Sequence, residues 1–146
     1  MSVEQCEEKL KDKGVRPTAA RILILQKLSE LTRPVSLFEL EAQFGTLDKS
    51  TISRTLSVLL EHHAIHSFED GSGSMKYEIC RSPSNTCYIG DRHIHFYCEI
   101  CHKTECISNV KIPLVQLPEG YVIDTINYTV KGICPACRRN DNSLSV

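Results

Sequence analysis

Apolar side chains recur at helical spacing through the first part of the chain, between short polar breaks. Residues 3–13 have a helix-forming composition that stops at Gly14. A second helix is expected from about residue 18 to 31, with Thr18 as its N-cap, before the Arg-Pro pair at 33–34. Its apolar face consists of Ile22, Leu25 and Leu28, broadened by Leu23 and Ile24. The pattern therefore predicts two packed helices at the start of the chain.

A short helix and a longer one follow, separated by a turn. Ser36 and Glu39 form a capping box for a helix over residues 37–44. After the turn, Asp48 caps a helix over residues 49–64. The inward positions of this helix are Ile52, Leu56, Leu59 and Leu60. Its other side carries Lys49, Ser50, Ser53, Arg54 and Ser57. Such a helix-turn-helix pattern, with hydroxyls and cations near the start of the second helix, is typical of DNA-binding proteins.

Two alternating stretches after these helices predict a β-hairpin. Residues 64–68 and 75–80 alternate as strands do, and residues 69–74 have the composition of a turn. A hairpin directly after a helix-turn-helix is a wing, and its Lys76 is expected to contact a phosphate. The expected DNA contacts are Arg16, Arg21, Lys49, Ser50, Thr51, Ser53, Arg54 and Lys76. Without the hairpin, a small helical bundle with a solvated face would explain this half equally well.

Two Cys-x-x-Cys pairs dominate the second half. Residues 81–92 have the polar, Pro- and Gly-containing composition of a hinge, which divides the chain into domains over 1–80 and 93–146. Each Cys-x-x-Cys turn can present two thiolates to one zinc ion, and two turns complete a tetrahedral shell. The expected structural zinc ligands are Cys98, Cys101, Cys134 and Cys137. Between the pairs, residues 120–132 alternate like a strand. The alternatives are a disulfide and a thiol-redox enzyme that uses the second pair.

A second metal site is expected where the hinge meets the second half. In an extended chain His93 and His95 point to the same face, so two imidazoles are available to one ion. The groups that could complete this site are Glu78, Cys80, Cys87 and His66. The alternatives are simple hydrogen bonding of the histidines and a buried, apolar role for Cys80. Cys6 is expected to pack or to lie at the surface. Cys106 and His102 could be spare ligands, but packing is preferred for Cys106 and solvation for His102.

The composition limits the class of protein. The 146 residues are 41% hydrophobic and 24% charged, which is ordinary for a soluble protein, and no apolar run is long enough to span a membrane. The charged N-terminus has no apolar signal core, so we expect a cytoplasmic protein whose eight cysteines serve metal or redox chemistry. The net charge of −1 requires any DNA contact to come from a local basic face. Paired catalytic carboxylates, a nucleophile elbow and a phosphate loop are lacking, so no enzyme is expected.

Five segments occur in order between about residues 15 and 137: RPTAARILIL, STISR, GSGSMKYEIC, HIHFYCEIC and ICPAC. In this order and spacing they resemble the Fur superfamily of bacterial metal-responsive repressors. The resemblance implies an α+β fold, with an N-terminal winged helix-turn-helix DNA-binding domain and a small C-terminal α/β dimerisation domain that holds a four-cysteine zinc site. It also implies a homodimer that binds palindromic operator DNA and represses metal-homeostasis genes when a second, regulatory divalent ion is bound.

The resemblance further implies a set of regulatory ligands. Family members use the His-x-His pair, here His93 and His95, and a carboxylate on the last wing strand, here Glu78. The zinc-sensing branch instead uses a cysteine ahead of that pair and a residue on the first wing strand. These places correspond here to Cys80 or Cys87, and to His66. Because thiolate favours zinc, Zn²⁺ is preferred as the regulatory ion over Fe²⁺ or Mn²⁺. An iron or peroxide sensor is the alternative within the family, and a zinc-ribbon protein-interaction module is the alternative outside it.

Several positions depart from the family pattern. Residues 33–34 are Arg-Pro where many members carry a histidine ligand, and Ser53 replaces the usual tyrosine of the recognition helix. Ligands of an accessory metal site are replaced by Arg92, Ile94 and Ile133, so that site is not expected. Pro113 and Pro118 should shorten the long helix of the C-terminal domain. Bound metal is expected to fix winged helices that otherwise swing about residues 81–92, in the spacing that an operator selects.

Overall fold

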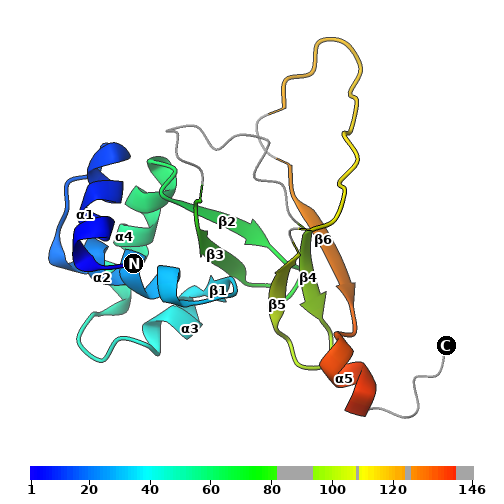
Figure 1. Ribbon diagram of the computed structural model, residues 1–146, viewed down its shortest axis with the longest axis horizontal. Coiled ribbons are helices and arrows are strands. Elements are labelled where there is room, and N and C mark those ends of the chain that lie inside the picture. The colour runs from blue at the N-terminus through cyan, green and yellow to red at the C-terminus, as the bar shows by residue number, and fades with distance from the viewer. Residues whose placement is uncertain (82–93, 108, 124–125, 141–146) are drawn as a thin grey trace.

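Four N-terminal helices and two three-stranded sheets make up most of the described chain. The structure is a computed structural model that describes residues 1–81, 94–107, 109–123 and 126–140. The N-terminal elements are α1 (Val3–Asp12), α2 (Ala19–Glu30), β1 (Val35–Ser36), α3 (Leu37–Glu41), α4 (Lys49–Glu61), β2 (Ile65–Glu69) and β3 (Met75–Ile79). The C-terminal elements are β4 (Ile94–Cys98), β5 (Thr104–Ile107), β6 (Tyr128–Gly132) and α5 (Pro135–Asn140). The β2–β3 hairpin extends from the helices toward the second sheet (Figure 1).

Side-chain caps begin the first four helices. The three N-caps expected from the sequence are confirmed, because Thr18, Ser36 and Asp48 each accept a hydrogen bond from a backbone N–H in the first turn. Ser2 adds a capping box with Gln5 at the start of α1, which was not expected. α3 and α4 are shorter than expected and end at residues 41 and 61. Local hydrogen bonding therefore sets where the helices start.

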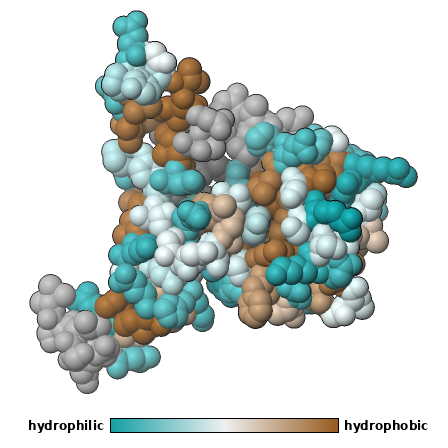
Figure 2. Space-filling view, turned by 180° about the vertical axis from the view of Figure 1, so that it is seen from behind, coloured by the Kyte–Doolittle hydropathy of each residue, from teal (hydrophilic) through white to brown (hydrophobic). Residues whose placement is uncertain are grey.

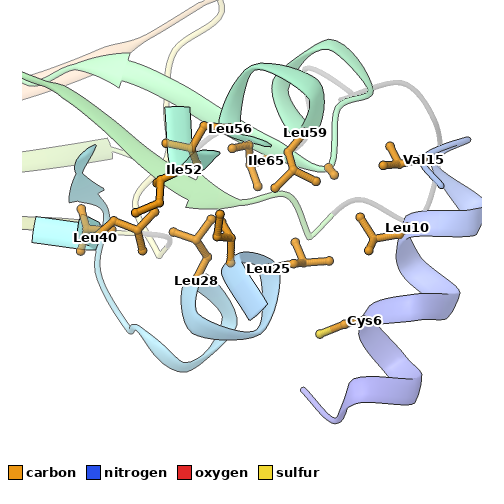
Figure 3. Packing of buried hydrophobic residues seen from close by; sticks show 13 residues of the cluster. Cys6, Leu10, Val15, Leu25, Leu28, Leu40, Ile52, Leu56, Leu59 and Ile65 are labelled. Atoms are coloured by element: carbon orange, nitrogen blue, oxygen red, sulfur yellow. The ribbon is translucent and has the colours of Figure 1, made fainter. Parts of the chain in front are cut away.

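An aliphatic core holds the N-terminal helices against the first sheet (Figure 3). Its buried members are Cys6, Leu10, Val15, Ile24, Leu25, Leu28, Val35, Leu40, Ile52, Leu56, Leu59, Ala64 and Ile65. Cys6, expected to pack or to lie at the surface, is buried. Ile24 is buried as expected, whereas Leu23, which was expected to broaden the same apolar face, is exposed. Burying one leucine side chain stabilises a fold by about 1.5–3 kcal/mol. The core therefore fixes the helix-turn-helix relative to the hairpin.

The expected hairpin follows α4 directly and forms most of the first sheet. β2 and β3 pair antiparallel, with Ser67 opposite Tyr77 and Phe68 opposite Lys76. β1 pairs with β3 on the other side, so the strand order is β1-β3-β2. β1 has only two residues, too few for an alternating pattern to be recognised in the sequence. The N-terminal half thus contains the helix-turn-helix and hairpin that the sequence predicts.

The second sheet, with strand order β5-β4-β6, forms the C-terminal half. β4 pairs antiparallel with β5 and parallel with β6. The strand expected over residues 120–132 forms only from Tyr128 onward within the described residues. Pro113 and Pro118 lie in a segment, 109–123, that forms no helix at all. Across the described ranges, no helix is both long and apolar enough to cross a membrane.

The turn of the β2–β3 hairpin lies against the second sheet. The Thr129 hydroxyl of β6 donates to the Glu69 carbonyl at 3.5 Å, and Lys131 Nζ donates to the Gly71 carbonyl at 3.2 Å. Gly71 has a φ of +83°, and a Cβ built there would come within 1.9 Å of the Lys131 side chain. Glycine therefore suits both the turn and the close approach of the lysine. The hairpin joins the two halves of the chain.

Candidate metal centres and DNA-binding face

Four sulfur atoms gather at the end of β4 and the start of α5. The Sγ atoms of Cys98, Cys101, Cys134 and Cys137 all lie within 4.8 Å of one another. Cys101 Sγ and Cys134 Sγ are 3.9 Å apart. A tetrahedral zinc ion with Zn–S bonds of about 2.3 Å places its sulfurs about 3.8 Å apart. The observed spacing fits zinc, and it uses both Cys-x-x-Cys pairs, whereas a redox enzyme would need only one.

Backbone amides prepare this group to hold a cation. Hydrogen bonds from the backbone N–H groups of Cys101 and Cys134 lower the pKa of the Cys98 thiol to about 6. The neighbouring thiols, Cys134 first, raise the pKa of Cys137 to about 12. Four thiols this close cannot all ionise without a compensating positive charge. A zinc ion would supply that charge, and such sites contribute directly to folding free energy.

A second group of potential ligands joins the two halves of the chain. Glu78 of β3, His95 of β4 and Cys106 of β5 place their ligand atoms within 4.8 Å of one another. His95 Nε2 lies 3.1 Å from Glu78 Oε1. The Cys106 thiol donates to Glu78 Oε2 at 3.0 Å. One carboxylate from the N-terminal hairpin therefore meets an imidazole and a thiol from the C-terminal sheet.

Strand pairing and an aromatic contact position these three side chains. His95 and Cys106 are direct partners in the antiparallel β4–β5 ladder, so they share one face of the sheet. The Phe68 ring stacks on the His95 ring, with centroids 3.4 Å apart and planes inclined by 19°. Phe68 belongs to β2, so the stack also presses the hairpin against the second sheet. The group is held by both halves.

The protonation of Cys106 matters for metal binding. Partial desolvation, followed by the hydrogen bond to Glu78 and the charge of that carboxylate, raises the pKa of the Cys106 thiol. The metal-free group therefore keeps a proton between sulfur and carboxylate. A divalent cation would replace this proton with a stronger positive charge. Imidazole, carboxylate and thiolate are all ligands that zinc accepts.

The structure groups some of the ligands expected for the second site and separates others. It brings Glu78 and His95 together and adds Cys106, which the sequence offered only as a spare ligand. The packing role preferred for Cys106 is wrong, because its side chain is exposed. His66 is the cross-strand partner of Glu78 but does not belong to the three-ligand group. Cys80 is buried at the end of β3 and is also outside that group. The other two expected ligands, His93 and Cys87, lie outside the described residues.

A strand that was not expected explains why Cys106 was missed. Thr104–Ile107 form β5, which turns back beside β4 after the first Cys-x-x-Cys pair. A hairpin whose turn contains Cys98 and Cys101 places Cys106 opposite His95. This spacing was the signal from which the sequence could have predicted Cys106 as a ligand. His102, expected to be solvated, is exposed, and its Nδ1 lies 2.8 Å from the Tyr97 hydroxyl.

The outer face of α4 carries most of the expected DNA contacts. Lys49, Ser50, Ser53 and Arg54 are exposed, and Thr51 is half-buried. The Ser50 and Thr51 hydroxyls donate to the Asp48 carboxylate at 2.5 and 3.0 Å. These bonds and the backbone N–H of Thr51 lower the pKa of Asp48 to about 2. Two hydroxyls therefore serve the helix cap, while Lys49 and Arg54 take part in no salt bridge among the described residues.

Lys76 does not lie where a phosphate contact requires. Its side chain is buried, and Nζ lies 3.5 Å from Glu39 Oε2 and 3.8 Å from Asp70 Oδ2. The alternating pattern predicted its strand correctly. The charge of its ammonium is, however, balanced inside the protein by the carboxylates of Glu39 and Asp70. The remaining two expected contacts stay near the surface, since Arg16 is exposed and Arg21 is half-buried and donates to the Arg16 carbonyl at 2.8 Å.

Sequence and structure comparisons converge on one group of proteins. Residues 12–122 match the ferric uptake regulator family. The ferric uptake regulator of Helicobacter pylori, described as having three functional metal binding sites, aligns with a TM-score of 0.67 at 17% identity, over 99% of this chain and 97% of that one. The regulator of Vibrio cholerae gives 0.64 at 18% identity, over 88% and 98%. A zinc uptake regulator complexed with zinc and DNA gives 0.63 at 19% identity, over 94% and 93%.

The structural likeness concerns the fold. All three identities are below 25%, and no curated protein matches the sequence significantly. The shared architecture is an N-terminal helical domain followed by a C-terminal α/β domain. Regulators of iron and of zinc both have it, so the fold does not identify the ion.

Proposed function

The chain belongs to the ferric uptake regulator family, and we propose that it is a metal-dependent, DNA-binding transcriptional repressor. Its regulatory ion is held by Glu78, His95 and Cys106, and its structural zinc by the four-cysteine group. The observation that carries this proposal is the meeting of ligands from both halves of the chain in one group. Such a group can make the relative position of the two halves depend on metal, because it gains its full set of ligands in only one arrangement.

Each ligand has a defined task. Glu78 brings the hairpin that follows the recognition helix to the second sheet, and His95 supplies a neutral imidazole nitrogen. Cys106 supplies a sulfur ligand once its proton has left. His93, two residues before His95, is the proposed fourth ligand and lies outside the described residues. A bound divalent ion would crosslink the two halves through these side chains.

The regulatory ion is proposed to be zinc. A thiolate beside an imidazole and a carboxylate favours Zn²⁺ over Fe²⁺ and Mn²⁺, which prefer oxygen and nitrogen ligands. Cys106 now supports this preference within the described group, where the sequence offered Cys80, Cys87 and His66. Glu78 and His95 alone would suit Fe²⁺, so an iron-responsive regulator is the second candidate.

The proposed DNA-binding face is the exposed side of α4 with nearby cations. Lys49 and Arg54 lie in the first half of this helix, next to exposed Ser53. Arg16 and Arg21 lie just before and at the start of α2. Cations near a helix N-terminus contact phosphates, and short polar side chains reach base edges. Lys76 is not part of the proposed face.

The chain is proposed to act as a homodimer on a palindromic duplex. The segment 109–123 projects from the second sheet and carries apolar side chains on its surface (Figure 2). Leu114, Tyr121 and Val122 are 69%, 70% and 94% exposed. Such a concentration of exposed apolar side chains is typical of a protein interface, and a second copy of the chain is the proposed partner. Two-fold symmetry then places two recognition helices on two half-sites.

DNA selection followed by a metal titration tests the function. Duplexes bound by the zinc-loaded protein, and in parallel by the iron-loaded protein without oxygen, are selected from a random library. The strongest duplex is labelled with fluorescein, and its Kd is measured by anisotropy with Zn²⁺, Fe²⁺, Mn²⁺ or a chelator. We expect a palindromic sequence and binding at least about tenfold tighter with zinc than with the chelator.

Two results would change the proposal. Tighter binding with Fe²⁺ than with Zn²⁺ would favour the iron-responsive candidate. Failure to enrich any duplex under any metal condition would reject a DNA-binding function and favour a zinc-ribbon protein-interaction module.

A further inference from the structure

Asp70, in the turn of the β2–β3 hairpin, carries a buried charge that neither metal group uses. Its side chain is fully buried and accepts hydrogen bonds from the Ser72 backbone N–H at 2.9 Å and from the Thr104 hydroxyl. Burial acts to raise the pKa of Asp70, but these hydrogen bonds and the Lys76 charge outweigh it, so the pKa is lowered. An ionised carboxylate is retained here despite its desolvation cost.

Lys76 extends this contact into the helix-turn-helix. Its buried ammonium lies between the carboxylates of Asp70 and Glu39. Glu39 also pairs with Arg33, at 2.8 Å, and accepts the Ser36 backbone N–H at 2.8 Å in the cap of α3. A continuous polar path therefore runs from β5, through the hairpin, to the start of α3. α3 packs in turn against α4, which carries the proposed DNA contacts.

The same two strands carry ligands of the second metal group. Lys76 and Glu78 are two residues apart on β3, and Thr104 and Cys106 are two residues apart on β5. In each strand the two side chains point to the same face, because residues i and i+2 of a strand do so, and their Cα atoms are about 7 Å apart. The hairpin and β5 therefore meet at two neighbouring points. At one, Asp70 binds Thr104; at the other, Glu78 binds Cys106.

We propose that Asp70 is a positioning residue that couples the second metal group to the helix-turn-helix. This inference rests on the proposed function, because it takes Glu78 and Cys106 as ligands of the regulatory ion. When these two side chains are held at a fixed separation, the neighbouring Asp70–Thr104 contact is held as well. Lys76 and Glu39 then transmit the position of that contact to the cap of α3. Without the Asp70–Thr104 contact, the chain still binds the metal, but metal binding no longer fixes the orientation of α4.

Asp70→Ala and Thr104→Val remove the contact from either side, and Ser74→Ala changes an exposed hydroxyl in the same turn as a matched control. For each protein, the Kd of the second zinc is measured by competition with a chromophoric chelator. The Kd of the selected duplex is measured with zinc and without it. The ratio of the two DNA affinities is the coupling, which in metal- or ligand-responsive proteins is typically about 5- to 150-fold.

We expect both variants to bind zinc within about threefold of wild type, and the metal-free proteins to bind DNA equally. Zinc should tighten their DNA binding by less than about a fifth of the wild-type factor, with Ser74→Ala unchanged. The double variant should lose no more than either single one, because both remove the same contact. Thermal unfolding followed by circular dichroism checks the fold, and Thr104→Val decides alone if Asp70→Ala does not fold.

Each contrary result has a distinct meaning. Full coupling in both single variants would overturn the inference while leaving the proposed function intact. A large loss of zinc affinity would also overturn it, because Asp70 would then only support the metal group. A wild-type protein whose DNA affinity ignores Zn²⁺, Fe²⁺ and Mn²⁺ alike would refute the proposed function, and this inference with it.

Discussion

Zinc binding to the Glu78–His95–Cys106 group should release the Cys106 proton throughout the mildly alkaline range. Partial desolvation and the adjacent Glu78 carboxylate raise the pKa of this thiol above its ordinary value. The thiol is therefore protonated in the metal-free protein well above neutral pH. Zinc binds the thiolate, so each binding event must displace that proton.

The magnitude follows from this proton count. Release of one proton makes zinc affinity rise about tenfold per pH unit, or about 1.4 kcal/mol per unit. The sign is fixed, because a thiol with a raised pKa opposes metal binding more strongly as pH falls. An ordinary thiol would lose this dependence above about pH 8.5, where it is already ionised. For Cys106 the slope should continue unchanged to about pH 9.

The assay starts from protein that already holds one zinc at the four-cysteine group. The second zinc is titrated by chelator competition at intervals between about pH 7.5 and 9, and calorimetry in two buffers counts the released protons. Cys106→Ser should bind zinc more weakly and without this slope. Cys6→Ala, which removes a buried thiol outside both metal groups, should retain it. A slope that flattens above about pH 8.5, or that survives in Cys106→Ser, would refute the reasoning.

Three further predictions concern the core, the structural zinc and the dimer. Leu25→Ala should lower the free energy of unfolding, measured by urea denaturation, by about 2–5 kcal/mol. Leu23→Ala, on the exposed side of α2, should lower it by less than about 1 kcal/mol. Equal losses would contradict the described packing. Cys98→Ser should abolish tight zinc binding at the four-cysteine group and unfold the second sheet, seen as lost zinc in elemental analysis and lost strand signal in circular dichroism, because such sites supply on the order of 10 kcal/mol. Val122→Asp should give the mass of one chain in light scattering, while Phe38→Asp, an exposed apolar position on α3, should remain dimeric; a dimer in both would exclude segment 109–123 from the interface.

The N-terminal half could be predicted because its signals are local. Thr18, Ser36 and Asp48 each cap a helix within one turn of themselves. Leu25 and Leu28 recur at helical spacing on a buried face. Such patterns need no knowledge of distant residues. The helices and the hairpin therefore follow from short stretches of sequence.

The C-terminal half depended more on tertiary pairing. β5 has four residues, and only its position beside β4 identifies it as a strand. Because β5 was not expected, Cys106 could not be placed opposite His95. The four-cysteine group was predictable without such pairing, since two Cys-x-x-Cys turns supply the four thiolates of a tetrahedral zinc site whatever strands lie between them.

Lys76 illustrates the limit of pattern reading in the hairpin. Alternation predicts which side of a strand a residue faces, but not what covers that side. A cation in a wing therefore suggested DNA contact. Asp70 and Glu39, which surround its ammonium, come from a turn and from a helix that only the folded chain brings together. The interdomain role of the hairpin follows from the same tertiary contacts.

Zinc stoichiometry tests most directly whether the Glu78–His95–Cys106 group controls DNA binding. The anisotropy of the selected duplex is recorded while zinc is added stepwise to metal-free protein, for wild type and His95→Ala in parallel. In the wild type, the first equivalent per chain should fill the four-cysteine group and leave DNA affinity low, and the second should raise it to a plateau. His95→Ala should take up the first equivalent and stay at low affinity. Full DNA affinity after one equivalent, or a normal second step in His95→Ala, would contradict the assignment of this group as the regulatory site.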